Sequence, residues 1–169
     1  MDSGSVLLAN AAATAALGAE LARRWLVFGG QAGLGAGPTV LLLEGNLGAG
    51  KTSLVQGLAA ALGIDEAITS PSFALAQHYG GRCNGRPTAL VHLDLYRLEQ
   101  PAAADELFAQ EEEEALALGA LMAVEWPGRL SFEPEAAWHV ELQLLDPERP
   151  EAGRRALLRL PPDRPAGPQ

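Results

Sequence analysis

The 169-residue sequence predicts an α/β fold, a three-layer sandwich whose central sheet is mixed and mainly parallel. Two continuous apolar runs, at residues 39–43 and 121–125, are typical of parallel strands covered on both faces. Segments of helical composition lie beside them at 51–62 and 101–118. Strands that alternate with helices pack as layers of helix on sheet.

The first predicted elements of the chain are a short edge strand at 5–9 and a helix at 11–27. The helix is predicted from its alanine content and from apolar residues spaced four apart, which are Leu17, Leu21 and Trp25. A glycine-rich connection at 29–38 then leads to the first central strand. Gly63 is expected to end the helix at 51–62.

The second half of the chain is predicted to complete the sheet. Residues 72–79 and 88–93 should form a hairpin whose turn is the polar segment around Cys83. Apolar and polar residues alternate at 138–145, as in a half-exposed strand, and 156–160 should form a last strand.

Length and composition indicate one domain at 1–160, followed by a proline-rich tail at 161–169 that is expected to be disordered. The formal net charge is −9 with 12 basic residues, which argues against direct binding of nucleic acid. The single cysteine excludes an internal disulfide and a multi-thiolate metal site. No apolar stretch is long enough to span a bilayer, so a cytoplasmic protein without a membrane partner is expected.

The chemistry of the chain is indicated by Gly45-Asn46-Leu47-Gly48-Ala49-Gly50-Lys51-Thr52, which fits the phosphate-binding pattern G-x-x-x-x-G-K-[ST]. Glycines let backbone N–H groups approach phosphate oxygens, and the following helix directs its positive end at the same anion. Lys51 is the only lysine, so this pattern would arise by chance in roughly one such chain in a thousand. The loop follows a strand and precedes a helix, which predicts a P-loop NTPase-like fold that binds a nucleoside triphosphate with Mg²⁺.

Two acidic residues end predicted strands and are candidates for catalysis or for Mg²⁺ binding. Asp94 follows Val91-His92-Leu93, and Glu125 ends the run at 121–125. Acids at the carboxyl ends of strands beside a P-loop commonly manage the metal and the attacking group. His92 would face the same side as Asp94 in a regular strand, where a supporting or core role is expected of it.

Four segments outside the P-loop resemble the TsaE (YjeE) family of bacterial ATPases. Their residues are Ala13-Thr14-Ala15-Ala16-Leu17-Gly18, Thr69-Ser70-Pro71-Ser72-Phe73, His92-Leu93-Asp94-Leu95-Tyr96-Arg97-Leu98 and Val124-Glu125-Trp126-Pro127. The combination of D-L-Y-R-L with a later E-W-P is specific to that family.

The resemblance implies an ATP hydrolase that needs Mg²⁺ and has low activity without its partners, the TsaB and TsaD proteins. Together they would form threonylcarbamoyladenosine at position 37 of ANN-reading tRNAs, with tRNA bound only indirectly. The implied catalytic residues are Lys51, Asp94 and Glu125. The implied Mg²⁺ ligands are Thr52, Asp94 and Glu125. The implied ATP-binding residues are Thr14, Leu47, Gly48, Ala49, Gly50, Lys51, Thr52, Ser53 and Trp126, and the implied switch-like segment is Ser70, Pro71 and Ser72.

Two alternatives share the same loop. A small-molecule P-loop kinase would usually carry an arginine-rich lid, and no such insertion is evident. A nucleotide-gated binding module would hydrolyse ATP only slowly. A guanine-specific GTPase is disfavoured because its N-K-x-D motif needs a second lysine.

Overall fold

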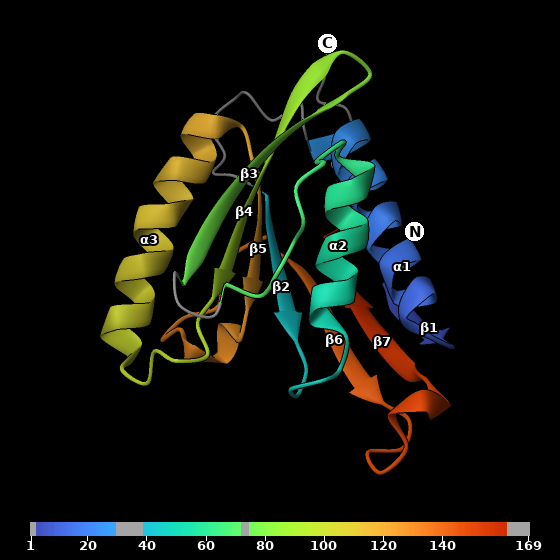
Figure 1. Ribbon diagram of the computed structural model, residues 1–169. Coiled ribbons are helices and arrows are strands. Elements are labelled where there is room, and N and C mark those ends of the chain that lie inside the picture. The colour runs from blue at the N-terminus through green and yellow to red at the C-terminus, as the bar shows by residue number, and fades with distance from the viewer. Residues whose placement is uncertain (1–2, 30–38, 72–74, 162–169) are drawn as a thin grey trace.

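The computed structural model describes residues 3–29, 39–71 and 75–161 (Figure 1). Its strands are β1 (Gly4–Leu8), β2 (Val40–Glu44), β3 (Ala76–Cys83), β4 (Arg86–Asp94), β5 (Leu121–Glu125), β6 (Trp138–Leu144) and β7 (Arg154–Arg159). Its helices are α1 (Ala11–Arg24), α2 (Lys51–Ala61) and α3 (Pro101–Leu118), with shorter turns at Trp25–Gly29, Pro127–Arg129 and Pro150–Ala152.

The strands form one mixed seven-stranded sheet in the order β1-β7-β6-β2-β5-β4-β3. Parallel pairings join the four central strands β6, β2, β5 and β4. The antiparallel pairings lie outside them, between β3 and β4, β6 and β7, and β1 and β7. The predicted α/β layered fold with a mixed sheet is confirmed, with the parallel pairings confined to its centre.

Helices cover the two faces of the sheet unequally. One apolar core joins α1 and α2 to alternate strand residues such as Leu41, Leu43 and Leu121. The intervening residues, among them Leu42 and Met122, belong to a second core that includes Phe108 of α3. Figure 1 shows α3 at one side of the sheet and the α1–α2 pair at the other. Strand side chains alternate between faces, so each site residue that lies in a strand can be assigned to one of the two faces of the sheet.

Helices α1 and α2 cross so closely that their backbones touch. A Cβ on Gly18 would lie 2.0 Å from the Leu54 carbonyl oxygen, and one on Gly57 would lie 1.8 Å from the carbonyl oxygen of Ala15. Only a residue without a Cβ permits this approach. Gly18, which belongs to the A-T-x-x-L-G segment, is therefore a packing residue that positions the helix following the P-loop.

The predicted hairpin exists, but its turn is shorter than the sequence suggested. β3 continues through Gly80 and Gly81 to Cys83, and only Asn84 and Gly85 form the turn, both at positive φ. Asn-Gly is the preferred pair for such a two-residue turn. Gly81 stays in the strand because it packs on the chain after α2, where a Cβ would lie 2.6 Å from the Gly63 carbonyl oxygen.

The remaining boundaries differ by a few residues from prediction, except α3 and β5, which match it. The predicted helix at 11–27 is α1 followed by a π-helical turn at Trp25–Gly29. Most of the connection at 29–38, Ser72 and Phe73, and almost all of the tail lie outside the described residues. Within the described ranges, no helix is both long enough and apolar enough to cross a membrane.

Candidate functional site

The P-loop leaves the carboxyl end of β2 at the centre of the sheet and leads directly into α2. Gly48 and Gly50 have φ values of 82° and 107°, which residues with a Cβ rarely adopt. The Ala49 N–H donates to the Asn46 carbonyl at 3.0 Å and closes the turn. Leu47 is 67% exposed at its tip, whereas Ala49 is buried in the core.

Helix α2 begins at this loop with Gly50 as its N-cap, and no side chain caps it. Its first N–H groups therefore remain available to an external acceptor. Thr52 and Ser53 are half-buried in the first turn. This arrangement, glycines at positive φ before an uncapped helix start, fits a phosphate group.

Lys51 is more enclosed than a residue of an open surface loop would be, since only 6% of it is exposed. Its Nζ donates to the Gly45 carbonyl and lies 4.1 Å from the centroid of the Trp126 ring. Burial lowers the pKa of Lys51 below its ordinary value of 10.5, and the charges of Glu125 and Asp94 partly offset this. The structure thus gathers the predicted Lys51, Asp94, Glu125 and Trp126 around one ammonium group.

The two acids are neighbours in register. Asp94 ends β4 opposite Glu125, which ends β5, and the pair lies on the face covered by α2. The Asp94 carboxylate is partly exposed and accepts the Tyr96 N–H at 3.0 Å and the Ser70 hydroxyl at 3.4 Å. The predicted switch-like segment therefore contacts Asp94 through exposed Ser70, next to buried Pro71.

Glu125 differs from Asp94 because it is almost fully enclosed. Its Oε2 lies 2.6 Å from Nε2 of His92, and the two side chains are 4% and 0% exposed. His92 Nδ1 is buried and has no hydrogen-bond partner. A carboxylate oxygen accepts, so this arrangement favours the tautomer with the proton on Nε2. The supporting role expected of His92 has a defined target, the carboxylate of Glu125.

Trp126 turns the chain out of β5 in a left-handed conformation, with φ of 58°. Its ring packs on Tyr96 with centroids 4.8 Å apart, and the Arg129 guanidinium lies 5.7 Å from the Tyr96 ring. Sequence reasoning did not assign Tyr96 or Arg129 to the site. Both lie in or just after the D-L-Y-R-L and E-W-P segments, which was the only available signal.

Thr14 is not brought to the loop surface. It is fully buried in α1, and its hydroxyl donates to the Asn10 carbonyl one turn earlier at 3.2 Å. Its contact with ATP stays a prediction. Ser72, the third member of the switch-like segment, lies outside the described residues.

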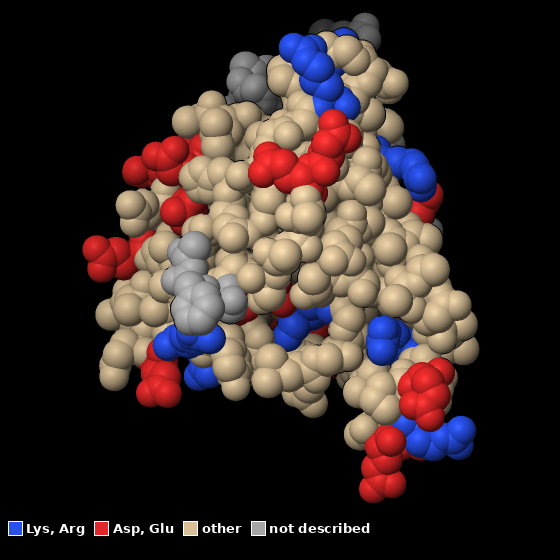
Figure 2. Space-filling view, viewed as in Figure 1, with Lys and Arg blue, Asp and Glu red and all other residues tan. Residues whose placement is uncertain are grey.

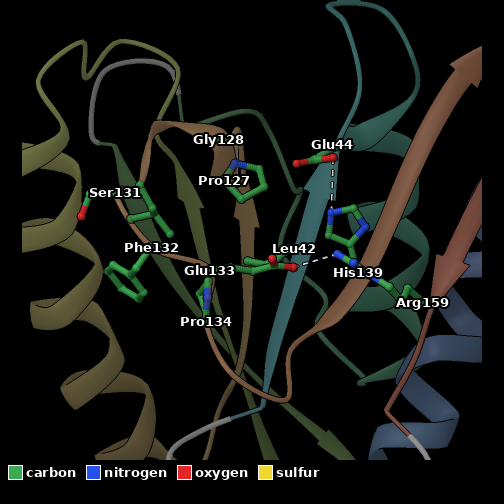
Figure 3. A pocket seen from close by; sticks show the side chains of 11 residues that line it. Leu42, Glu44, Pro127, Gly128, Ser131, Phe132, Glu133, Pro134, His139 and Arg159 are labelled. Atoms are coloured by element: carbon green, nitrogen blue, oxygen red, sulfur yellow. Dashed lines mark hydrogen bonds and ion pairs between the residues drawn. The ribbon is translucent and has the colours of Figure 1, made fainter.

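Two cavities lie beside the carboxyl end of β2, and both are lined by Glu44, Pro127 and Gly128. One of about 450 Å³ is bordered by Gly45, Asn46 and Trp126. The other, of about 400 Å³, opens on the sheet face opposite α2 (Figure 3). There His139 Nε2 lies 3.2 Å from Glu44 Oε2, and Arg159 donates to Glu133 at 2.8 Å. The ionic groups of this second cavity already pair with one another.

The donor set near Lys51 fits Mg²⁺ only together with phosphate oxygens. Within the described ranges, no group of three His, Cys, Asp or Glu side chains is arranged to hold a metal ion alone. Asp94 and Thr52 offer hard oxygen atoms beside the phosphate-binding loop. Mg²⁺ is commonly bound in this way, by one or two carboxylates plus the phosphates of a substrate.

Among the described residues, the basic side chains form no patch on the face of the molecule shown in Figure 2. On the face shown in Figure 2, the Lys and Arg side chains are scattered among acidic and uncharged ones. A surface that grips nucleic acid groups its cations along a stripe or patch.

Comparisons with known proteins agree with one another. The family model described as threonylcarbamoyl adenosine biosynthesis protein TsaE matches residues 8–155. The tRNA threonylcarbamoyladenosine biosynthesis protein TsaE of Mycobacterium leprae is 37% identical over 147 residues, which are 85% of this chain and 83% of that protein. Its counterpart in Nostoc is 42% identical over 104 residues, and the match spans only 62% of either chain. The crystal structure of Bacillus subtilis YdiB has the same fold, with a TM-score of 0.62, 22% identity, and coverage of 93% of this chain and 84% of that one.

Proposed function

The chain belongs to the TsaE family, named for threonylcarbamoyl adenosine biosynthesis, and we propose that it serves this pathway as a Mg²⁺-dependent ATPase. In the proposed role it acts with TsaB and TsaD, and its ATP turnover sustains modification of tRNA. The net charge of −9 supports contact with tRNA through those partners rather than through this chain.

The enclosed position of Lys51 carries the proposal. Its ammonium group is buried against the Gly45 carbonyl and the Trp126 ring at the uncapped start of α2, and it feels the charges of Glu125 and Asp94. An incoming polyphosphate can replace the carbonyl as the acceptor of this ammonium, and a charge-assisted bond is the stronger one. A glycine turn without function would not need a buried lysine.

The residues in and beside the loop have different proposed roles in binding the nucleotide and Mg²⁺. Backbone N–H groups from Gly48 to Thr52 donate to phosphate oxygens, and Lys51 adds a full positive charge. Thr52 and the partly exposed Asp94 are the residues best placed to hold Mg²⁺. When bound, that ion neutralises charge on the phosphates.

Glu125 is suited to a different task. One of its oxygens is engaged by His92 inside the core, which fixes the orientation of the carboxylate. We assign Glu125 to orienting the attacking water, with His92 as a positioning residue. Asp94, whose oxygens accept from Tyr96 and Ser70 at the surface, then responds to movement of the switch-like segment.

Nucleotide binding and hydrolysis test these assignments separately. Lys51→Ala should weaken ATP binding about 10- to 100-fold, the value of a charge-assisted contact. Glu125→Gln should keep ATP affinity and lose phosphate release, whereas Asp94→Asn should raise the Mg²⁺ concentration needed. Melting temperatures without nucleotide separate these effects from unfolding. Unchanged hydrolysis in the Glu125 variant would refute its role.

The partner proposal needs its own assay. Phosphate release should accelerate when TsaB and TsaD are added, and ATP should change how much of the pair this chain retains in a pull-down. Lys51→Ala, with its weakened ATP affinity, provides the control for the effect of nucleotide. ATP-dependent phosphorylation of a small molecule by the chain alone would instead identify a kinase.

A further inference from the structure

We propose that Arg154 is a second phosphate-binding residue of the P-loop and contacts the α- and β-phosphates of the nucleotide. The proposal rests on the ATP-binding function proposed above and adds a residue more than one hundred positions away from the loop in sequence. Nothing in the local sequence around Arg154 indicates this role.

Topology brings Arg154 to the loop. It is the first residue of β7, which runs antiparallel to β6, so it lies at the edge of the sheet where the parallel strands end. Ala156 and Leu158 belong to the core under α1 and α2, and Arg154 shares their face of the strand. Its guanidinium reaches the start of α2, since a Cβ built on Gly50 would lie 3.0 Å from Arg154 Nη1.

The positive groups around Arg154 favour binding of an anion at this position. Lys51 follows Gly50 directly, and the N-terminus of α2 adds a partial positive charge. A guanidinium beside them is disfavoured unless negative charge lies between. No carboxylate of the described residues forms an ion pair with Arg154, and its buried Nε donates no hydrogen bond. A bound polyphosphate would neutralise all three positive groups.

The order of strands indicates which phosphates Arg154 meets. Asp94 and Glu125 flank the loop on the β5–β4 side of β2, where the metal and the γ-phosphate are expected. Arg154 approaches from the β6–β7 side. It therefore contacts the part of the polyphosphate nearer the nucleoside, which ATP and ADP have in common.

The test compares ATP and ADP binding, with Mg²⁺ present, in the full chain and its variants. Arg154→Gln should weaken binding of both nucleotides by the same factor, about 10-fold. Arg155→Gln is the matched control, because Arg155 is the exposed neighbour on the opposite face of β7. Arg154→Lys should recover part of the affinity. Melting temperatures without nucleotide should be similar for all four proteins.

Any one of four results would overturn the proposal. The first is an unchanged nucleotide affinity of Arg154→Gln in an assay where the unsubstituted chain binds ATP. This result would leave the proposed function intact. Weakened ATP binding with unchanged ADP binding would assign Arg154 to the γ-phosphate instead. A lower melting temperature in Arg154→Gln, with full recovery of stability but no recovery of affinity in Arg154→Lys, would identify a packing role. Absence of ATP binding by the unsubstituted chain would refute the proposed function as well.

Discussion

His92 and Glu125 form a buried pair across adjacent parallel strands, with 2.6 Å between Nε2 and Oε2 and almost no exposure of either side chain. His92 stands two residues before Asp94 and shares its face of β4, while Glu125 is the register partner of Asp94. The histidine therefore lies beneath both candidate acids and holds one of them in place.

The first prediction concerns this pair. His92→Phe should lower the free energy of unfolding by about 1–3 kcal/mol, because the Glu125 carboxylate is left buried without its donor. Glu125→Leu alone should also lower the free energy of unfolding. The double variant should lose less of this free energy than the two single variants lose in sum. Urea unfolding of the four proteins without nucleotide measures this coupling. Strictly additive changes would mean that the contact has no energetic weight.

A second prediction follows from the lowered pKa of Lys51. Its ammonium group loses its proton at lower pH than that of an exposed lysine, so ATP affinity should begin to fall at a lower pH than the ordinary lysine pKa of 10.5 would give. The stability of the fold depends on this pKa in the opposite direction from the ATP affinity. Between the lowered pKa and 10.5 the unfolded chain binds more protons, so this residue makes stability rise with pH.

The check is an ATP titration at several pH values from neutral to alkaline. Lys51→Met is the control and should show weak binding that does not decline further over this window. An affinity of the unsubstituted chain that stays constant up to the ordinary lysine range would contradict the prediction.

A third prediction tests the crossing of α1 and α2. Gly18→Ala should destabilise the fold by about 1–3 kcal/mol or more, since the new methyl group would meet the Leu54 carbonyl at 2.0 Å. ATP binding should weaken too, because α2 begins at the P-loop. Gly4→Ala is the control, since its Cβ would meet no atom within 4 Å. Thermal unfolding of the two variants compares them directly, and equal melting temperatures would contradict the close approach.

A fourth prediction concerns Asp105 of α3 and Ser131, which follows the E-W-P segment. The Ser131 hydroxyl and the Ser131 N–H both donate to the Asp105 carboxylate. These bonds lower the pKa of the carboxyl below 3.8, and the hydroxyl has the larger effect. Ser131→Ala should raise this pKa toward 3.8 without reaching it, because the N–H remains. NMR titration of the carboxyl carbon measures the shift.

The sign for stability follows from the lowered pKa. The contribution of Asp105 is present above its unfolded value and is lost as the pH falls through the folded one. The loss on acidification should therefore be smaller in Ser131→Ala. Glu133→Ala, which changes the exposed Arg159–Glu133 pair nearby, should leave the Asp105 titration unchanged.

Features that depend on local sequence were predictable. The P-loop, the strand before it and the helix after it follow from glycine spacing and apolar runs, and α3 and β5 match their predicted bounds. The hairpin turn was misplaced because glycines at 80 and 81 looked like turn residues. Gly81 instead packs in β3 against the backbone of Gly63, a contact that no local pattern reveals.

The amino-acid sequence was enough to predict a phosphate-binding loop between a buried strand and a helix of an α/β fold, and to select Asp94 and Glu125 as the acids expected beside it. The environments of those residues could be read only from the folded chain. It buried Lys51 under Trp126, paired Glu125 with His92 and left Asp94 near the surface. It also enclosed Thr14 and brought Arg154 to Gly50. The physical reason is that strand pairing and helix packing join residues far apart in the chain, and burial follows from those contacts rather than from sequence spacing.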